Sequence, residues 1–193
     1  MIGLAFKAIQ KRLSSSEKYP KLYVDWYLEQ DKQNGDHTLY ETPAIFIEFK
    51  PNAWRSLSNG GQESESPFEI HIITEYVYGD GRVIDPKVSD HTYLMEHVYK
   101  ALQNVTLTYN DTLDDDEAPM ENPPILLRNI ERTNTVRHPH TIDNIMKSTF
   151  RFRSKLYDLT GSTDATRIEA YLDQIVLPIQ LIPDGDTMEF TID

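Results

Sequence analysis

Three glutamates on predicted strands are the residues best placed to do chemistry. Glu48, Glu69 and Glu75 lie in segments where polar and apolar residues alternate. Two carboxylates brought together by a fold could act as the acid and the base of a hydrolase. Acidic residues are also common on the solvent-exposed face of a sheet in a chain with 31 acidic and 19 basic residues. We therefore expect solvated surface groups here and keep a hydrolytic carboxylate pair as the less favoured alternative.

Two other motifs could bind a metal ion. Asp114, Asp115, Asp116 and Glu117 are consecutive, whereas a calcium-binding EF-hand loop alternates its oxygen ligands around a central Gly. The histidines of His138-Pro-His140 would point the same way in an extended chain and could reach one ion. This pair has no third ligand at a typical local spacing. We predict a solvated acidic loop, a surface turn, and no metal or other cofactor.

Signatures of nucleophilic catalysis are absent from the sequence. Neither GxSxG nor HExxH occurs, and neither glycine pair continues into a phosphate-binding GxxxxGK[ST] loop. The chain also has no cysteine, which excludes thiol nucleophiles and disulfides. On these grounds we predict that the protein is not an enzyme.

A row of cations near residue 150 is the most distinctive local pattern. In the segment 147–155 the apolar side chains of Phe150 and Phe152 alternate with cationic ones. The four cations of the row are Lys147, Arg151, Arg153 and Lys155. They could contact an acidic partner. A wet sheet face whose cations pair with acids such as Glu69 and Glu75 explains the row equally well.

The net charge restricts the kinds of partner. A formal charge of −12 disfavours nucleic acid, whose binding relies on phosphate neutralisation, and also disfavours an anionic membrane surface. We predict neither as a partner.

Hydrophobic periodicity places these residues on helices and strands. Residues 2–17 carry an apolar stripe at Ile2, Phe6, Ile9 and Leu13, which predicts an amphipathic helix. Alternation predicts strands over 21–30, 43–50, 68–78 and 144–157, and an extended segment over 125–135. A second helix is expected over 90–104 with Asp90 as its N-cap. Polar loops are expected over 51–67 and 110–124, a short helix over 164–176, and a hairpin of 179–182 with 188–192 around its turn.

This order of elements predicts an α+β fold. Strands joined by short polar turns pair antiparallel, because a parallel pair needs a crossover of about a dozen residues or more. We therefore expect a mostly antiparallel sheet with helices packed on one face, plus a C-terminal hairpin. The expected organisation is a core domain over 1–158, which a C-terminal helix and hairpin over 159–193 extend without forming a second domain.

The layout resembles the tail-terminator and tail-completion proteins of long-tailed bacteriophages. The matching pieces are the N-terminal helix, PAIFIEF (43–49), FEIHIITEYVYGDG (68–81), the helix over 90–104 and STFRFRSKLYD (148–158). The resemblance covers 1–158 and concerns the order of the elements and their residue patterns rather than a diagnostic motif. Residues 159–193 have no counterpart in it, and the two polar loops are longer than in the simplest members.

The resemblance implies a non-enzymatic virion component with no catalytic residues. Such proteins form rings, commonly hexameric, that cap the tail tube and meet the head connector. In a ring of this kind the basic row (Lys147, Arg151, Arg153 and Lys155) and the acidic loop with Asp114, Asp115 and Asp116 would be natural opposites across a subunit boundary. The implied partners are other copies of this chain and other tail or head–tail connector proteins, and the implied location is the virion tail, assembled in the bacterial host cytoplasm. Terminator, completion and head–tail joining roles all stay open, as does a protein-binding module of a non-phage bacterial system.

Overall fold

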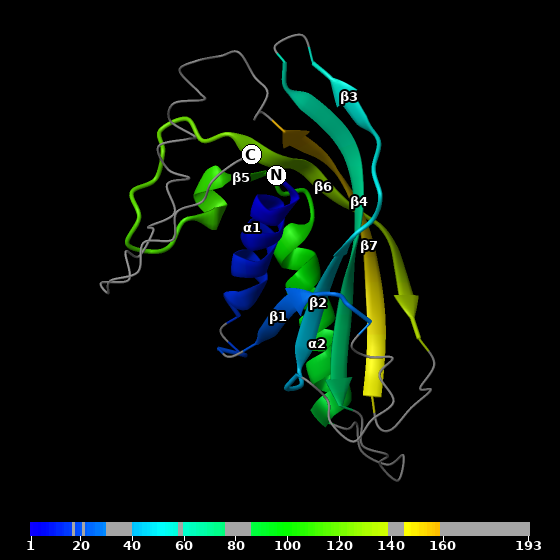
Figure 1. Ribbon diagram of the computed structural model, residues 1–193. Coiled ribbons are helices and arrows are strands. Elements are labelled where there is room, and N and C mark those ends of the chain that lie inside the picture. Colours follow the sequence, from blue (N-terminus) through cyan, green and yellow to red (C-terminus); the bar gives the residue numbers. More distant parts are fainter. Residues whose placement is uncertain are drawn as a thin grey trace, which may run out of the picture.

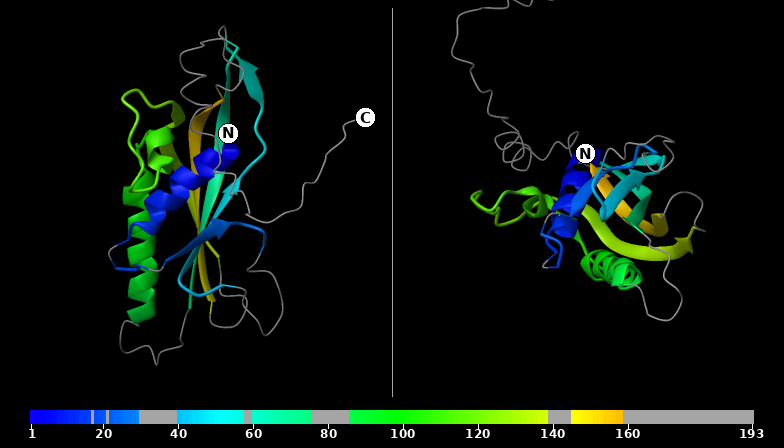
Figure 2. Two further views of the ribbon diagram at one scale, coloured as in Figure 1. Left: turned by 60° about the vertical axis from the view of Figure 1, so that its left-hand side comes forward. Right: turned by 90° about the horizontal axis from the view of Figure 1, so that it is seen from below.

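A twisted sheet carries both α-helices on one of its faces in the part of the chain that the structure describes (Figures 1 and 2). The computed structural model describes residues 1–16, 18–20, 22–29, 40–57, 60–75, 86–138 and 145–158. Along the chain the elements are α1 (Ile2–Ser14), β1 (Tyr23–Trp26), β2 (Ala44–Phe49), β3 (Trp54–Ser56), β4 (Gln62–Glu75), α2 (Pro86–Leu102), β5 (Leu107–Thr108), the 3₁₀ helix η2 (Tyr109–Thr112), β6 (Ile125–Arg137) and β7 (Ile145–Asp158).

The sheet is mostly antiparallel, which confirms the predicted α+β class. Its strand order is β1-β2-β4-β7-β6-β5. The short strand β3 pairs with the N-terminal end of β4. The β1–β2 pair is the exception and is parallel. The expectation of short turns was therefore wrong at this pair, because the connection between Trp26 and Ala44 is long enough for a crossover.

The core lies between the helices and the inner face of the sheet, the face turned toward α1 and α2. The predicted stripe of α1 is largely confirmed, since Phe6, Ile9 and Leu13 are buried and Ile2 packs against them. The sheet meets the helices with buried residues at alternate positions of its long strands. These residues include Ile45, Ile47, Phe68, Ile70, Ile72, Phe150, Phe152 and Leu156. Alternation within a strand sends the residues between them to the opposite face.

Several element boundaries differ from the sequence predictions. The segment predicted as a loop over 51–67 contains β3 and the first part of β4, so its two ends form a hairpin. Ser64 and Ser66 are buried where β4 was not expected, and small polar residues do not signal a buried strand face. The second helix begins at Pro86, so the prediction of Asp90 as its N-cap was wrong. Oδ1 of Asp90 instead lies 2.7 Å from Nζ of Lys18.

The predicted C-terminal helix over 164–176 and the predicted hairpin lie outside the described residues. The extension over 159–193 therefore stays a prediction. Among the residues that are described, none of the helices is long and apolar enough to cross a membrane.

Candidate functional site on the outer face of the sheet

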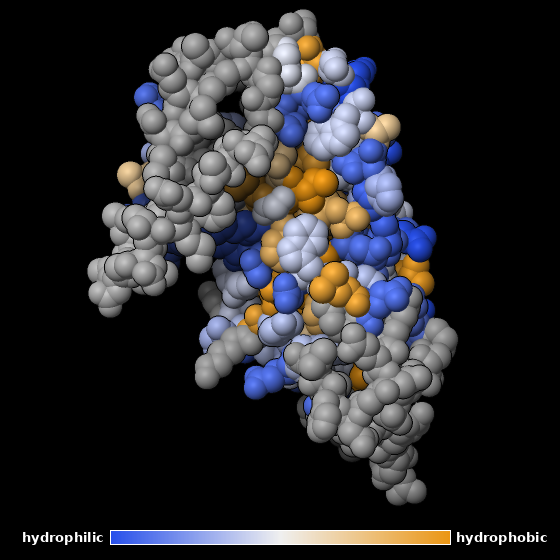
Figure 3. All heavy atoms as spheres, in the orientation of Figure 1, coloured by the Kyte–Doolittle hydropathy of each residue, from blue (hydrophilic) through white to orange (hydrophobic). Residues whose placement is uncertain are grey.

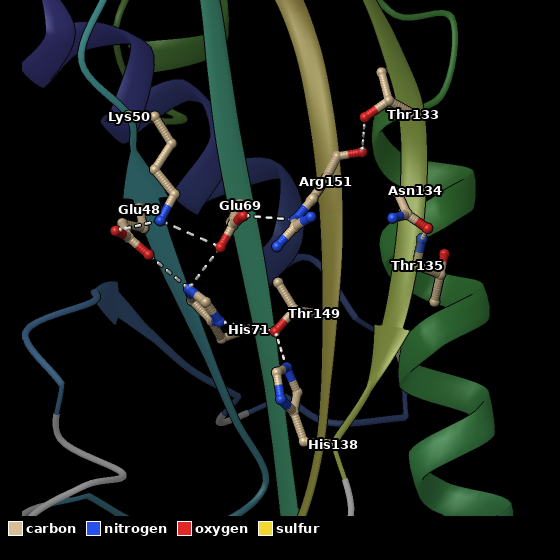
Figure 4. Close-up of polar contacts among 10 residues, drawn as sticks. All are labelled: Glu48, Lys50, Glu69, His71, Thr133, Asn134, Thr135, His138, Thr149 and Arg151. Carbon is tan, nitrogen blue, oxygen red and sulfur yellow. Dashed lines mark hydrogen bonds and ion pairs between the residues drawn. The ribbon is translucent and has the colours of Figure 1, made fainter.

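The outer face of the sheet, opposite α1 and α2, carries a connected group of polar side chains. The register sets Glu48 of β2 directly opposite Glu69 of β4, and Glu69 directly opposite Arg151 of β7. Two residues further along, on the same face, His71 of β4 faces Thr149 of β7. Lys50 follows the last residue of β2, where its amide N–H donates to the carbonyl of Pro67. Three strands thus bring these six side chains into one cluster, which we call the Glu–His cluster (Figure 4).

The two carboxylates of the cluster share an ammonium group and an imidazole. Nζ of Lys50 lies 2.5 Å from Oε1 of Glu48 and 3.3 Å from Oε2 of Glu69. Nε2 of His71 lies 3.0 Å from Oε2 of Glu48 and 3.9 Å from Oε2 of Glu69. The remaining oxygen of Glu69, Oε1, accepts a hydrogen bond of 2.8 Å from Nε of Arg151. All four carboxylate oxygens therefore have a cationic or imidazole neighbour.

The imidazole of His71 is held on its other side as well. Nδ1 lies 3.0 Å from Oγ1 of Thr149, and the same hydroxyl lies 2.8 Å from Nε2 of His138 (Figure 4). The ring of Tyr27 stacks on His71 with 4.0 Å between ring centroids. Nζ of Lys147 in turn lies over the Tyr27 ring, 4.8 Å from its centroid. These contacts leave His71 only 4% exposed, so its position and orientation are well defined.

The protonation states of the cluster follow from burial and hydrogen bonding. Burial lowers the pKa of His71 below 6.5, although Glu48 and Glu69 act in the opposite direction, so the imidazole is neutral at pH 7. Burial alone would raise the pKa of Glu48, but hydrogen bonds from Lys50 and His71 outweigh it and the pKa is lowered. A carboxyl group that donates a proton in hydrolysis needs a raised pKa, and Glu48 does not have one.

Of the three predicted surface glutamates, the structure brings two together. Glu48 and Glu69 form the suspected pair, while Glu75 lies apart and accepts a hydrogen bond from the hydroxyl of Thr42. The paired histidine motif is only partly described: His138 contacts Thr149, and His140 lies outside the described residues.

The predicted basic row lies along the outer face of β7, and acids of neighbouring strands pair with its arginines. Arg151 contacts Glu69, and Arg153 contacts Glu131 of β6 at 2.7 Å. The two arginine side chains are still 53% and 66% exposed, so both remain accessible from solvent. The two lysines of the row differ: Lys147 donates to the hydroxyl of Tyr27, and Lys155 is an exposed residue opposite Glu65.

The predicted acidic loop lies against α1. All three aspartates are exposed: a carboxylate oxygen of Asp114 is 3.9 Å from Nζ of Lys7, and one of Asp115 is 3.3 Å from Nζ of Lys11. Because α1 packs on the inner face, the sheet separates this loop from the basic row. The structure therefore does not bring the two predicted groups together within one chain.

Hydrophilic and hydrophobic surfaces are unevenly distributed over the side of the molecule seen in Figure 1. Hydrophilic side chains gather along the edge on the right, where β3 and β4 lie, and hydrophobic ones show nearer the middle (Figure 3). Beneath the surface of the outer face lies a small apolar cluster of buried residues, formed by Tyr40, Ala44, Phe46 and Ile73 with Tyr27 and Ile145 packed against it.

Sequence reasoning missed three members of the Glu–His cluster: Lys50, His71 and Thr149. Alternation puts Glu69 and His71 on the same side of one strand, and Thr149 and Arg151 on the same side of another. The missing information was the register that joins these strands. No local sequence signal specifies that register.

Comparisons with known proteins place the chain only loosely. No family model matches it, and no curated protein matches it. Among solved structures it is similar to a chain described as "Virion of native gene transfer agent (GTA) particle", with 12% identity and a TM-score of 0.47, covering 81% of this chain and 96% of that one. A likeness at this level establishes neither a common family nor a common function.

Proposed function

We propose that this protein is a non-enzymatic structural component of a phage or prophage tail that acts by assembling into a ring. The order α1, β1, β2, β4, α2 and β7 follows the layout that resembles tail-terminator and tail-completion proteins. In this proposal its partners are further copies of itself and other tail or head–tail connector proteins. It would be assembled in the bacterial host cytoplasm and would function in the virion tail as a terminator, completion or head–tail joining protein.

The observation that carries the proposal is the separation of two opposite charge groups by the sheet. The cations of β7 lie on the outer face, while Asp114 and Asp115 lie beyond α1, which packs on the inner face. A head-to-tail ring needs two different complementary surfaces on each subunit. Opposite charges on opposite sides of one subunit meet that requirement, because the cations of one copy can face the acids of the next.

The ion pairs of Asp114 and Asp115 do not oppose such contacts. The carboxylates of Asp114 and Asp115 are 68% and 102% exposed, and each lies more than 3 Å from its lysine. Pairs between exposed side chains contribute little to stability, because solvent screens them and because holding them costs side-chain entropy. Exchanging an intramolecular partner for one in a neighbouring subunit therefore costs little.

A charge-swap experiment on the full chain tests the proposed contact. One variant carries Arg151→Glu and Arg153→Glu, and the second carries Asp114→Lys and Asp115→Lys. Each variant alone would set like charges against each other at every subunit boundary. In an equimolar mixture, alternating subunits would restore opposite charges at every boundary, and the ring would contain an even number of subunits. Light scattering coupled to size-exclusion chromatography measures the mass of each species.

The expected result is a ring for the unmodified chain, monomers for each variant and a ring for the mixture. Circular dichroism checks that both variants remain folded, and Glu96→Lys on the exposed surface of α2 serves as a charge-reversal control that should still assemble. An unmodified chain that stays monomeric at every accessible concentration would contradict self-assembly. A folded pair of variants that fails to assemble on mixing would contradict the proposed contact.

A further inference from the structure

Three donor atoms of the Glu–His cluster are arranged as ligands of a metal ion. A carboxylate oxygen from Glu48, one from Glu69 and a ring nitrogen of His71 all lie within 4.8 Å of one another. Two carboxylates and one imidazole make up a donor set that Zn²⁺ accepts, with the fourth tetrahedral position open to water. We propose that Glu48, Glu69 and His71 bind a Zn²⁺ ion in exchange for the ammonium group of Lys50.

The spacing of the donors fits a small ion with little rearrangement. Zinc–oxygen and zinc–nitrogen bonds of about 2.0–2.2 Å place tetrahedral ligand atoms roughly 3–4 Å apart. Nε2 of His71 already lies 3.0 Å from Oε2 of Glu48 and 3.9 Å from Oε2 of Glu69. Arg151 contacts the other oxygen of Glu69, Oε1, and can stay in place when Oε2 binds a metal.

The surroundings of His71 can orient it as a ligand. A metal at Nε2 requires the proton of the neutral ring to sit on Nδ1, where it would be donated to Oγ1 of Thr149. The hydroxyl of Thr149 can then donate its own proton to Nε2 of His138, 2.8 Å away. The chain from His71 through Thr149 to His138 thus satisfies the tautomer that binds metal.

Lys50 is the competitor for this position and is able to leave it. Its ammonium group lies between the two carboxylates, which is the place that a cation would take. Its side chain is 34% exposed and follows the end of β2, so it can turn toward solvent. A doubly charged ion then replaces a single charge between two carboxylates. Removing Lys50 should therefore improve metal binding.

Calorimetric titration of the untagged full chain with ZnCl₂ at pH 7.5 tests the site. The unmodified chain should bind one Zn²⁺ at this cluster, and His71→Gln should weaken that binding by about tenfold or more. Lys50→Met should strengthen it several-fold, because no ammonium group has to be displaced. Glu96→Gln and His97→Gln are matched controls on α2, outside the cluster, and should bind as the unmodified chain does.

Each outcome of the titration decides for or against the site. Weaker binding in His71→Gln together with tighter binding in Lys50→Met would support it. Unchanged binding in His71→Gln, or unchanged or weaker binding in Lys50→Met, would overturn it. Should His71→Gln fail to fold, Glu48→Gln replaces it, because the side chain of Glu48 is more exposed than that of His71. This substitution removes the charged ligand by turning the carboxylate into an amide. Unchanged affinity of Glu48→Gln for Zn²⁺ would also overturn the proposal. The ring need not form for this measurement, so its result is independent of the proposed assembly.

Discussion

His71 and Thr149 form a direct pair across β4 and β7, and their Nδ1 and Oγ1 atoms lie 3.0 Å apart. Both residues are almost fully buried, with 4% and 3% of their surfaces exposed, although they stand on the face of the sheet opposite α1 and α2. Because the other ring nitrogen faces Glu48, the imidazole joins three neighbouring strands. The protonation of this one ring is therefore coupled to the stability of the sheet.

We predict that His71 makes the free energy of unfolding fall as the pH falls below neutrality. Its folded pKa is lowered from 6.5 mainly by burial, so below pH 6.5 the unfolded chain binds the proton more readily than the folded one. Stability that is fully present above pH 6.5 is lost between 6.5 and the lowered folded pKa. Urea unfolding from about pH 8 to about pH 5 measures the slope.

The slope must be compared with that of His71→Gln, which retains the other histidines. The unmodified chain should lose stability more steeply than the variant over this range. Glu48, whose pKa is lowered from 4.5, contributes its own loss only at lower pH, so it does not interfere. Parallel slopes for the two proteins would show that His71 does not titrate differently in the folded and unfolded chains.

A second prediction concerns the aromatic packing of the inner face. Phe152 of β7 stacks on Phe68 of β4 with 5.3 Å between ring centroids, and both rings are buried. Phe152→Ala should lower the free energy of unfolding by about 3–5 kcal/mol, because it leaves a cavity as well as removing apolar contact. Leu28→Ala, at a residue that is 74% exposed, should change it by less than about 0.5 kcal/mol. Similar losses in the two variants, measured by urea unfolding, would contradict this packing.

The faces of the long strands could be predicted from the sequence, because alternation is a local property. The separation of Phe150 and Phe152 from Arg151 and Arg153 is as the sequence indicated. The Glu–His cluster could not be predicted in the same way. Its members come from strands far apart in the chain, and only the register of β2, β4 and β7 sets Glu48 beside Glu69 and His71 beside Thr149.

The error at the start of β4 has a local physical cause. The first part of β4 buries Ser64, whose hydroxyl donates to the carbonyl of Ala53, so hydrogen bonding takes the place of the apolar signal that predicts a strand. In β6 the register shifts beside Asn129, which adopts a positive φ of 54°. Such irregularities bend a strand and turn side chains to new faces, which periodicity in a sequence does not reveal.

A third prediction concerns the contact between the two helices. Nε of Arg12 in α1 donates a hydrogen bond of 2.6 Å to the carbonyl of Ala101, in the last turn of α2. A cationic side chain at this point satisfies a carbonyl that has no partner within its own helix. Arg12→Met keeps most of the apolar stem and should cost about 1–2 kcal/mol of unfolding free energy.

Lys100→Met is the matched control for Arg12→Met. Lys100 pairs with Glu96 one turn earlier on the exposed surface of α2, where ion pairs contribute little. Its substitution should leave the urea midpoint unchanged within error. Equal effects of the two substitutions would mean that Arg12 acts only as another surface charge.

The fourth prediction concerns a buried histidine between α2 and the sheet. His91 is 2% exposed, and its ring nitrogens lie 2.9 Å from Oγ1 of Thr74 and 2.8 Å from Oγ of Ser148. His91→Leu should cost about 2–5 kcal/mol of unfolding free energy, because it leaves two hydroxyls without their imidazole partner in the core.

Replacing those hydroxyls as well, in the triple variant His91→Leu, Thr74→Val and Ser148→Ala, should recover at least about 1 kcal/mol of the loss. Urea unfolding of the single and triple variants measures the recovery. Two further substitutions in a packed core ordinarily add to the damage, so a gain in stability would identify the unpaired hydroxyls as its source. A triple variant that is no more stable than the single one would contradict this prediction.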